Sequence, residues 1–178
     1  MVQSVRLQAG DTAAHALLLL APLFQRRHNT IQDAVVAALP SSDNDDQEVL
    51  VNRRPTTFTS NLRVDLTIID RSAATVTMVD FKSPIETNPE AFEDARRRNA
   101  EKYADLAEAY RRLGFSVTLD AVCVGALGSW DPANDSILRR LGIPRSRSNG
   151  LKRKACREVL HLSRNIWVQH CTGVPQTF

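Results

Sequence analysis

The sequence is poor in cysteine and has no long apolar run. Its three cysteines are widely spaced among 178 residues, a pattern that argues against a disulfide framework and favours a reducing compartment. The longest apolar run, residues 16–24, is far too short to span a bilayer. Only Arg6 precedes it as a positive charge and Asp11 lies close by, so an apolar helix is a better interpretation than a signal peptide. We therefore expect an intracellular protein with no membrane partner.

Extremes of charge and composition are also missing. Hydrophobic residues make up 43% and charged residues 24% of the chain, values that exclude wholesale disorder. The net charge of +3 and the isoelectric point near 9.0 are compatible with an anionic partner without requiring one. A chain of this length suits one domain with a substantial core.

Helix signals occupy the first part of the chain and its second half. Residues 1–10 are expected to form a short strand or an extended segment. Asp11 or Thr12 is then expected to cap a helix to about Leu20, and a second helix is expected over residues 26–39. Further helices are predicted from an Asn88 cap with Pro89 at the first helical position to Gly114, after "WDPAND" with Asp131 or Asn134 as cap, and over residues 151–169.

Strand signals fall between these helices. An acidic polar loop at residues 40–48 is followed by three runs rich in β-branched residues, at 49–52, 62–70 and 75–81. The last two are joined by "DRSAA", which is short enough for an antiparallel hairpin. Residues 115–125 form a mostly apolar run that predicts a central strand. The order of elements indicates a mixed α/β fold with a helical crossover.

Three charged residues lie in the predicted hairpin. Residues two apart in a strand face the same side, so Asp80 and Lys82 should project together, away from Phe81. Asp65 lies on the partner strand, and the turn can bring it beside Asp80. Two close carboxylates require a cation, and Mg²⁺ binds both carboxylate and phosphate oxygens. The set is the minimum for metal-assisted phosphodiester hydrolysis, although a charged strand end with Asp65 capping a turn would look the same.

Lys102 lies at the border of the apolar stripe of the long predicted helix. From there it can reach over the ends of the strands on which the helix packs. A lysine whose stem covers apolar surface while its amine stays in water is the simpler alternative.

Together these segments resemble a known family. Asp, about fourteen residues and then Asp-x-Lys is similar to the PD-(D/E)xK nuclease core. More specifically, the chain resembles the restriction-like endonuclease domain at the C-terminal end of site-specific non-LTR retrotransposon polyproteins. The matching positions are Arg63, Asp65, Asp80, Pro84, Glu86, Lys102 and Tyr103, with Arg27, His28 and Asn29 matching an R-H-N segment.

The resemblance implies a PD-(D/E)xK-like mixed sheet flanked by helices. Residues 1–40 would be a helical segment with a degenerate zinc knuckle, and residues 41–178 the nuclease domain. Asp65 and Asp80 would bind Mg²⁺, which Mn²⁺ could replace, with the Phe81 carbonyl as a third ligand. Lys82 and Lys102 would assist catalysis. The implied product is a 3′-hydroxyl for target-primed reverse transcription, made in the nucleus on double-stranded DNA beside a reverse transcriptase module. The alternatives are an inactive nucleic-acid-binding remnant with a nuclease-like fold and a small α/β protein-interaction domain.

The chain departs from the family pattern at several positions. Val64 replaces a proline, and Asn99 replaces the first lysine of the K-x-x-K-Y helix motif, while Lys82 supplies a lysine on the strand. Either Lys82 or Lys102 could therefore be the essential lysine. In the knuckle region His15 could be the surviving histidine, but Ala21 stands where a cysteine is expected, so no structural zinc is expected.

A basic run without acids covers residues 139–157. It could contact phosphates or form a solvated face. The candidate DNA contacts are Arg63, Arg27 and His28 near the carboxylates, and Arg145, Arg147, Lys152, Arg153 and Lys154 in this run. His28 could equally be a structural histidine, and Glu48 and Glu86 are further possible metal ligands.

Overall fold

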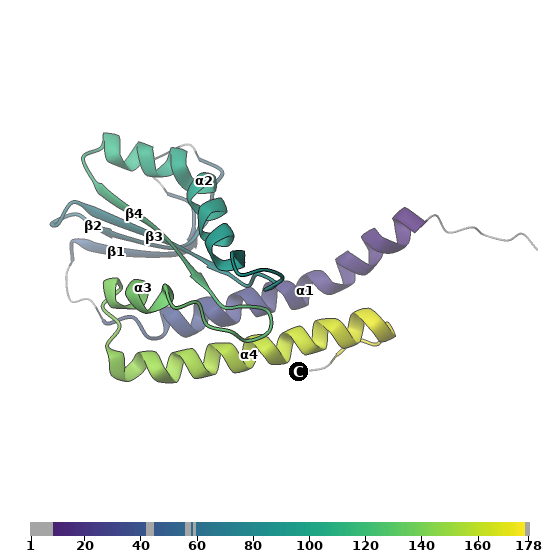
Figure 1. Ribbon diagram of the computed structural model, residues 1–178. Helices are drawn as coiled ribbons and strands as arrows, with labels where there is room; N and C mark the ends of the chain where they lie inside the picture. Colours follow the sequence, from purple (N-terminus) through teal and green to yellow (C-terminus); the bar gives the residue numbers. More distant parts are fainter. Residues whose placement is uncertain (1–8, 42–44, 56–57, 59, 177–178) are drawn as a thin grey trace, which may run out of the picture.

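The computed structural model of the chain describes residues 9–41, 45–55, 58 and 60–176, and it describes side chains from Leu19 onward. The predicted mixed α/β fold is confirmed (Figure 1). The elements are α1 (Ala9–Val36), β1 (Gln47–Arg53), β2 (Val64–Asp70), β3 (Thr75–Lys82), α2 (Ala91–Arg112), β4 (Ser116–Cys123), α3 (Asn134–Arg140) and α4 (Arg145–Thr172). Most of the expected lead-in, residues 1–8, and the side chain of His15 lie outside this description.

The four strands form one mixed sheet in the order β1-β2-β3-β4. The first three are antiparallel, and the predicted hairpin joins β2 to β3. Strand β4 runs parallel to β3 after the helical crossover through α2. The prediction of a central position for β4 is wrong, because β4 is an edge strand. Its apolar character has another cause: its last residues, Ala121 to Cys123, are buried beneath helices, even though no strand of the described part of the chain pairs with its outer edge.

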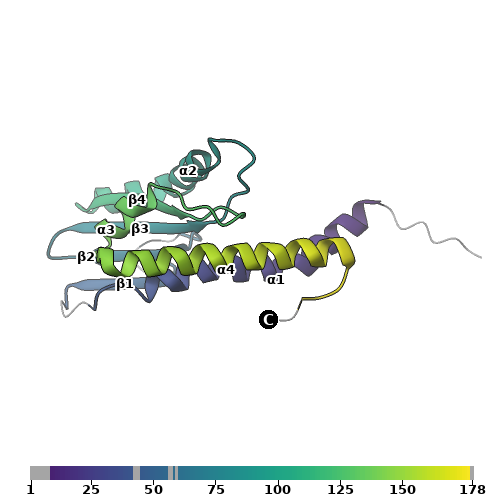
Figure 2. The same ribbon diagram turned by 60° about the horizontal axis from the view of Figure 1, so that its bottom comes forward.

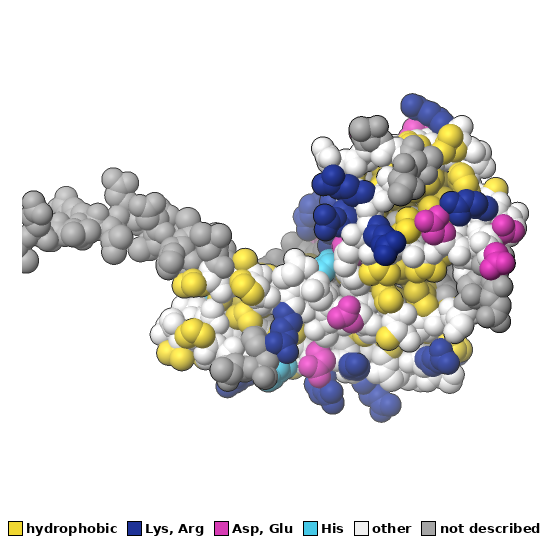
Figure 3. Space-filling view, turned by 180° about the vertical axis from the view of Figure 1, so that it is seen from behind, with side chains coloured by type: hydrophobic (Ala, Val, Ile, Leu, Met, Phe, Trp, Pro, Cys, Tyr) yellow, Lys and Arg dark blue, Asp and Glu magenta, His cyan; other side chains and the backbone are white. Residues whose placement is uncertain are grey.

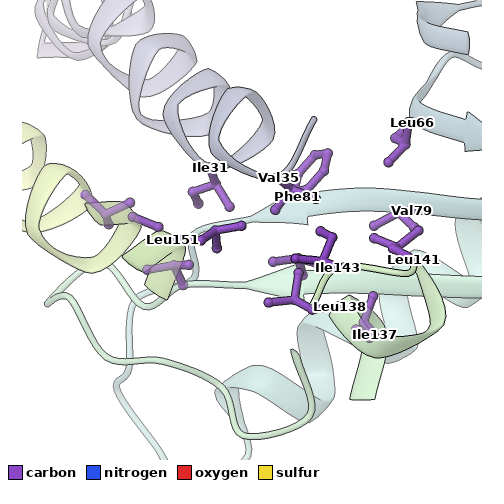
Figure 4. Close-up of a cluster of buried hydrophobic side chains, with 14 residues drawn as sticks. Ile31, Val35, Leu66, Val79, Phe81, Ile137, Leu138, Leu141, Ile143 and Leu151 are labelled. Carbon is purple, nitrogen blue, oxygen red and sulfur yellow. The ribbon is translucent and has the colours of Figure 1, made fainter. Parts of the chain in front are cut away.

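Helices cover both faces of the sheet. Helix α2 lies on one face, and α1, α3 and α4 lie on the other (Figures 1 and 2). The larger hydrophobic cluster fills the second layer, where Ile31 of α1 and Leu151 of α4 meet Val79 and Phe81 of β3 (Figure 4). The opposite face packs Met78 and other strand residues against Tyr103 and Tyr110 of α2. The core therefore holds the strand ends rigidly between two helical layers.

Helix α1 is continuous, which corrects the prediction of two helices separated near residues 21–25. Pro22 lies inside it and removes one backbone hydrogen bond. Leu20 and Leu23 flank that proline and pack on Ile166 of α4. This packing offsets the missing hydrogen bond. Helices α1 and α4 run antiparallel and side by side (Figure 2).

The helix starts also differ from the predictions. Helix α1 begins at Ala9, so residues 9–10 of the expected lead-in and the expected caps Asp11 and Thr12 lie inside the helix. Helix α2 begins at Ala91, after Glu90, so Asn88 and Pro89 precede it. Helix α3 follows Ala133, whose N–H is bound by the Asp131 carboxylate. Helix α4 begins at Arg145, directly after Pro144. The proline ends the preceding turn, and it does not interrupt a helix that starts after it. Within the described part of the chain, no helix combines the length and apolarity needed to cross a membrane.

Candidate functional site

The two carboxylates lie where β2 and β3 separate. The antiparallel ladder pairs Leu66 with Val79, so the next facing positions are Asp65 and Asp80. The strands do not pair there. Instead, the Phe81 N–H donates to Asp65 Oδ2 at 2.9 Å, so a side chain replaces the missing ladder contact. The hairpin register thus places one carboxylate opposite the other, as the sequence indicated.

Two lysines converge on Asp80 from different elements. Lys82, at the end of β3, forms an ion pair with Asp80 Oδ2. Lys102, on α2, places its Nζ 3.7 Å from the same oxygen. Asp80 itself is only 2% exposed, whereas both lysines reach solvent. The buried acid is therefore contacted at one oxygen by two partly solvated cations.

Tyr103 holds Lys102 in place. The Lys102 ammonium donates a hydrogen bond of 2.6 Å to the Tyr103 hydroxyl, and that hydroxyl donates to the Arg63 carbonyl at 3.0 Å. The ammonium also lies 4.4 Å from the centre of the tyrosine ring. Because Tyr103 is buried against the sheet, it fixes the position of α2 relative to the start of β2. The adjacent lysine and tyrosine thus act as one unit.

His28 approaches the carboxylates from α1, on the other side of the sheet. Its Nε2 is 3.3 Å from Asp65 Oδ2, and its ring meets Phe81 edge to face at 6.4 Å between centroids. The site therefore draws side chains from both helical layers as well as from both strands of the hairpin.

Arg27, the neighbour of His28, is buried and joins three parts of the chain. Its guanidinium donates to Ser163 Oγ of α4 at 3.0 Å and to the Ser83 carbonyl after β3 at 3.4 Å. Burial lowers the pKa of this guanidinium. These contacts hold α1, α4 and the end of β3 together beneath the carboxylates.

The pKa values of the two acids are shifted in opposite directions. Burial, together with the neighbouring Asp65 carboxylate, raises the pKa of Asp80 to about 6. Burial also acts to raise the pKa of Asp65, but hydrogen bonds from His28 and from the Phe81 N–H outweigh it and lower that pKa. The hydrogen bond to Asp65 in turn raises the pKa of His28. Asp65 is therefore the acid that ionises readily, and Asp80 is the acid that keeps its proton to higher pH.

The site opens into a cavity of about 540 Å³ between α1 and the strand ends. Its lining includes Phe24, Gln25, His28, Asn52, Arg63, Asp65, Asp80, Lys82 and Lys102. Lys and Arg side chains gather along the junction between the rounded body and the arm formed by α1 and α4 (Figure 3). An anionic chain could reach the carboxylates through this opening.

The donor set fits a cation that keeps much of its hydration. Among the described residues, no group of three or more His, Cys, Asp or Glu side chains is arranged as a metal site. Asp65 and Asp80 are therefore two carboxylates without a third acid. Mg²⁺ is commonly held by one or two carboxylates together with water and substrate phosphate, so two are enough for it. A cation beside Asp80 would also relieve the repulsion that raises its pKa.

The basic segment of α4 lies at the other end of the sheet. Arg140 and Leu141 border a hollow with Asp70 and Thr75, at the turn of the hairpin, and α4 begins just beyond them. Arg145 and Lys152 line a separate hollow next to α3. The structure thus brings Arg63 and His28 into the cavity with the carboxylates. The first half of α4, which begins beside α3 at the far end of the sheet (Figure 1), carries Arg145, Arg147, Lys152, Arg153 and Lys154, and none of them belongs to the described lining of that cavity.

The two other candidate metal ligands, Glu86 and Glu48, make contacts elsewhere in the structure. Glu86 accepts the Leu127 N–H at 3.0 Å and the Ser129 hydroxyl, so it fastens the loop after β4. Glu48 pairs with Arg71 at 2.8 Å beside the hairpin turn. Neither contact leads to the cavity that contains Asp80.

Asn52 is a site residue that the sequence argument missed. The β1–β2 register places it opposite Asp65, and its backbone has a φ of 53° in the left-handed region. It lines the same cavity as both carboxylates. Extending the register from Asp80 through Asp65 to β1 would have pointed to it, but the pairing of β1 was not known from the sequence.

Comparisons with known proteins do not identify the chain. No protein-family model matches it, and a search of curated proteins gives no match. Its function must therefore be argued from the site itself.

Proposed function

We propose that the chain is a Mg²⁺-dependent DNA endonuclease domain with a PD-(D/E)xK-like core. The observation that carries this proposal is the convergence of two carboxylates and two lysines in one open cavity. Asp65 and Asp80 come from facing strand positions, and Lys82 and Lys102 come from different elements. Such a set combines cation binding with positive charge directed at a phosphate.

The side chains divide into distinct roles. Asp65 and Asp80 would hold the cation, and the backbone carbonyl of Phe81 would be a further ligand. When bound, Mg²⁺ (or Mn²⁺ in its place) supplies a Lewis acid that polarises the phosphate and lowers the pKa of water. Lys82 would orient the attacking water, and Lys102, held by Tyr103, would stabilise negative charge on the phosphate.

The overall reaction is hydrolysis of one phosphodiester bond. The water oxygen forms a bond to phosphorus, the bond from phosphorus to the 3′-oxygen breaks, and a proton passes to that oxygen. The products are a 3′-hydroxyl and a 5′-phosphate. A 3′-hydroxyl is the end that a polymerase extends, which agrees with the resemblance to the endonuclease domain of non-LTR retrotransposon polyproteins. The same proposal gives the domain a reverse transcriptase module as its partner and the nucleus as its place of action.

A nicking assay tests this function. Supercoiled plasmid is incubated with the purified protein in Mg²⁺ or in EDTA, and the open-circular product is measured. The protein should nick only with Mg²⁺, and Asp80→Asn should lower the rate by at least about 100-fold, since the loss of one metal ligand removes several kcal/mol of stabilisation. The matched control is Asp94→Asn, because Asp94 pairs with Arg97 on the solvated face of α2 and should not affect cleavage.

Two results would contradict the proposal. Equal nicking by wild type and Asp80→Asn would remove the carboxylates from the mechanism. Salt-sensitive DNA binding without nicking in either Mg²⁺ or Mn²⁺ would instead identify a binding domain that has lost catalysis.

A further inference from the structure

A second hollow, of about 360 Å³, adjoins the cavity on its α2 side. It lies between the loop that follows β3 and the first half of α2, and it is lined by Lys82, Ser83, Pro84, Ala95, Arg98, Asn99 and Lys102. Lys82 and Lys102 line both spaces, so the two lysines form the boundary between them. Any ligand in the hollow would therefore be the immediate neighbour of a ligand at Asp80.

The hollow is positively charged. Lys82, Arg98 and Lys102 border it, and none of the described residues that line it is acidic. Lys82 and Lys102 share a single acid, Asp80, which lies on the other side of them. Three cations against one carboxylate leave an excess of positive charge that favours an anion in the hollow.

Arg98 differs from the two arginines that precede it. Arg96 pairs with Asp131, and Arg97 pairs with Asp94 at 2.7 Å and with Glu101 at 3.3 Å. Asp94, one turn earlier on α2, interacts with the charge of Arg98, but within the described residues no acid lies at ion-pair distance from Arg98, which is exposed at the rim of the hollow. Its guanidinium is therefore available for an external oxyanion, and a guanidinium binds phosphate oxygens well because its N–H groups form a planar fork.

Ser83 adds an unused hydroxyl to the same lining. Its Oγ is buried and has no hydrogen-bond partner among the described residues, although buried hydroxyl groups normally have one. A hydroxyl can donate to an oxyanion, so rotation of this side chain toward the hollow would give a bound anion a neutral donor.

We propose that this hollow binds a backbone phosphate of the DNA strand, next to the phosphate held at Asp80. The placement of that neighbouring phosphate rests on the proposed nuclease function, whereas the oxyanion site itself rests on the three cations and Ser83. Arg98 would bind the phosphate from the rim, Lys82 and Lys102 would lie between the two phosphates, and the contact would not depend on DNA sequence.

DNA binding measured without cleavage tests this site. Fluorescence anisotropy with a labelled duplex is recorded in EDTA at several salt concentrations for wild type, Arg98→Ala and Arg97→Ala. Loss of one phosphate contact should weaken binding by about 5- to 10-fold and reduce the slope of log affinity against log salt by about 1. Arg97→Ala removes the same charge from the adjacent position of the helix, where two acids already neutralise it, and should change neither quantity. Arg98→Lys should restore most of the slope.

The result that overturns the inference is an Arg98→Ala variant with the affinity and salt slope of wild type, or with the same losses as Arg97→Ala. Because no Mg²⁺ is present, this outcome is independent of nicking. A reduced slope for Arg98→Ala alone supports the phosphate site even if the plasmid is never nicked, so the two proposals can fail separately.

Discussion

Replacing Asp80 by asparagine should make the protein more stable at pH 8 when no divalent cation is present. In the wild type, Asp80 is 2% exposed and faces the Asp65 carboxylate, so its ionisation is opposed by burial and by like charge. Asparagine has nearly the same shape and carries no charge. The substitution therefore removes the unfavourable ionisation and retains the packing.

The sign and size of the expected change in unfolding free energy follow from the raised pKa of Asp80. The pKa rises from 3.8 to about 6 on folding, so the folded protein holds this proton more tightly than the unfolded chain. The stability that the proton contributes is present below pH 3.8 and is lost as the pH rises through about 6. A rise of about two pH units at about 1.4 kcal/mol each gives an upper limit of about 3 kcal/mol. Because the variant also loses the contacts with Lys82 and Lys102, we expect a gain of about 1–3 kcal/mol.

Urea denaturation in EDTA at pH 4.5 and pH 8 measures this effect. The difference in unfolding free energy between Asp80→Asn and wild type should become more favourable to the variant as the pH rises. At pH 8 the melting temperature of the variant should be higher by roughly 2–10 °C. His28, whose pKa is raised above 6.5, loses its contribution at higher pH than Asp80 does, and because it is present in both proteins most of its effect cancels, apart from the small part that Asp80 itself causes. A variant that is less stable than wild type at pH 8, or a difference that is independent of pH, would refute the reasoning.

Two further substitutions test how the strands are held. Asn52 has a φ of 53°, which glycine adopts freely, so Asn52→Gly should change the unfolding free energy little, while Asn52→Ala should cost about 1–2 kcal/mol; equal effects in urea denaturation would contradict this. Asn134 is fully buried, accepts the Cys123 N–H at 2.9 Å and donates to the Cys123 carbonyl at 2.7 Å. Asn134→Ala should therefore cost about 2–5 kcal/mol in the same assay, and a cost below about 1 kcal/mol would show that water replaces both bonds.

The pairing of Asp65 with Asp80 could be predicted because it depends on short-range rules. Strand periodicity placed Asp80 and Lys82 on one face, and the short turn fixed the register of the hairpin closely enough to bring Asp65 opposite. The position of Lys102 followed in the same way from helix periodicity. Each of these inferences needed only local geometry and one packing contact.

The remaining features depend on contacts between distant segments. The sequence around Pro22 does not indicate that α1 continues through it. The continuation depends on the packing of Leu20 and Leu23 against Ile166 of α4. The basic residues of α4 have no sequence pattern that says which end of the sheet they occupy. Arg27 could not be placed from the sequence either. Its motif suggested a phosphate contact, but its guanidinium is buried and donates a hydrogen bond to Ser163.

The contact between Arg27 and Ser163 spans 136 positions of the chain, and it has a consequence for synthesis. Helix α1 is synthesised before the strands of the sheet, while α4, the helix that supports it, is synthesised after them. A nascent chain that ends before α4 has both carboxylates but lacks the layer that holds His28 against Asp65. The same dependence applies to a chain trimmed by a protease. Formation of α4 is thus expected to complete the layer behind the carboxylates, so the contact between His28 and Asp65 depends on a helix that follows both residues in the chain.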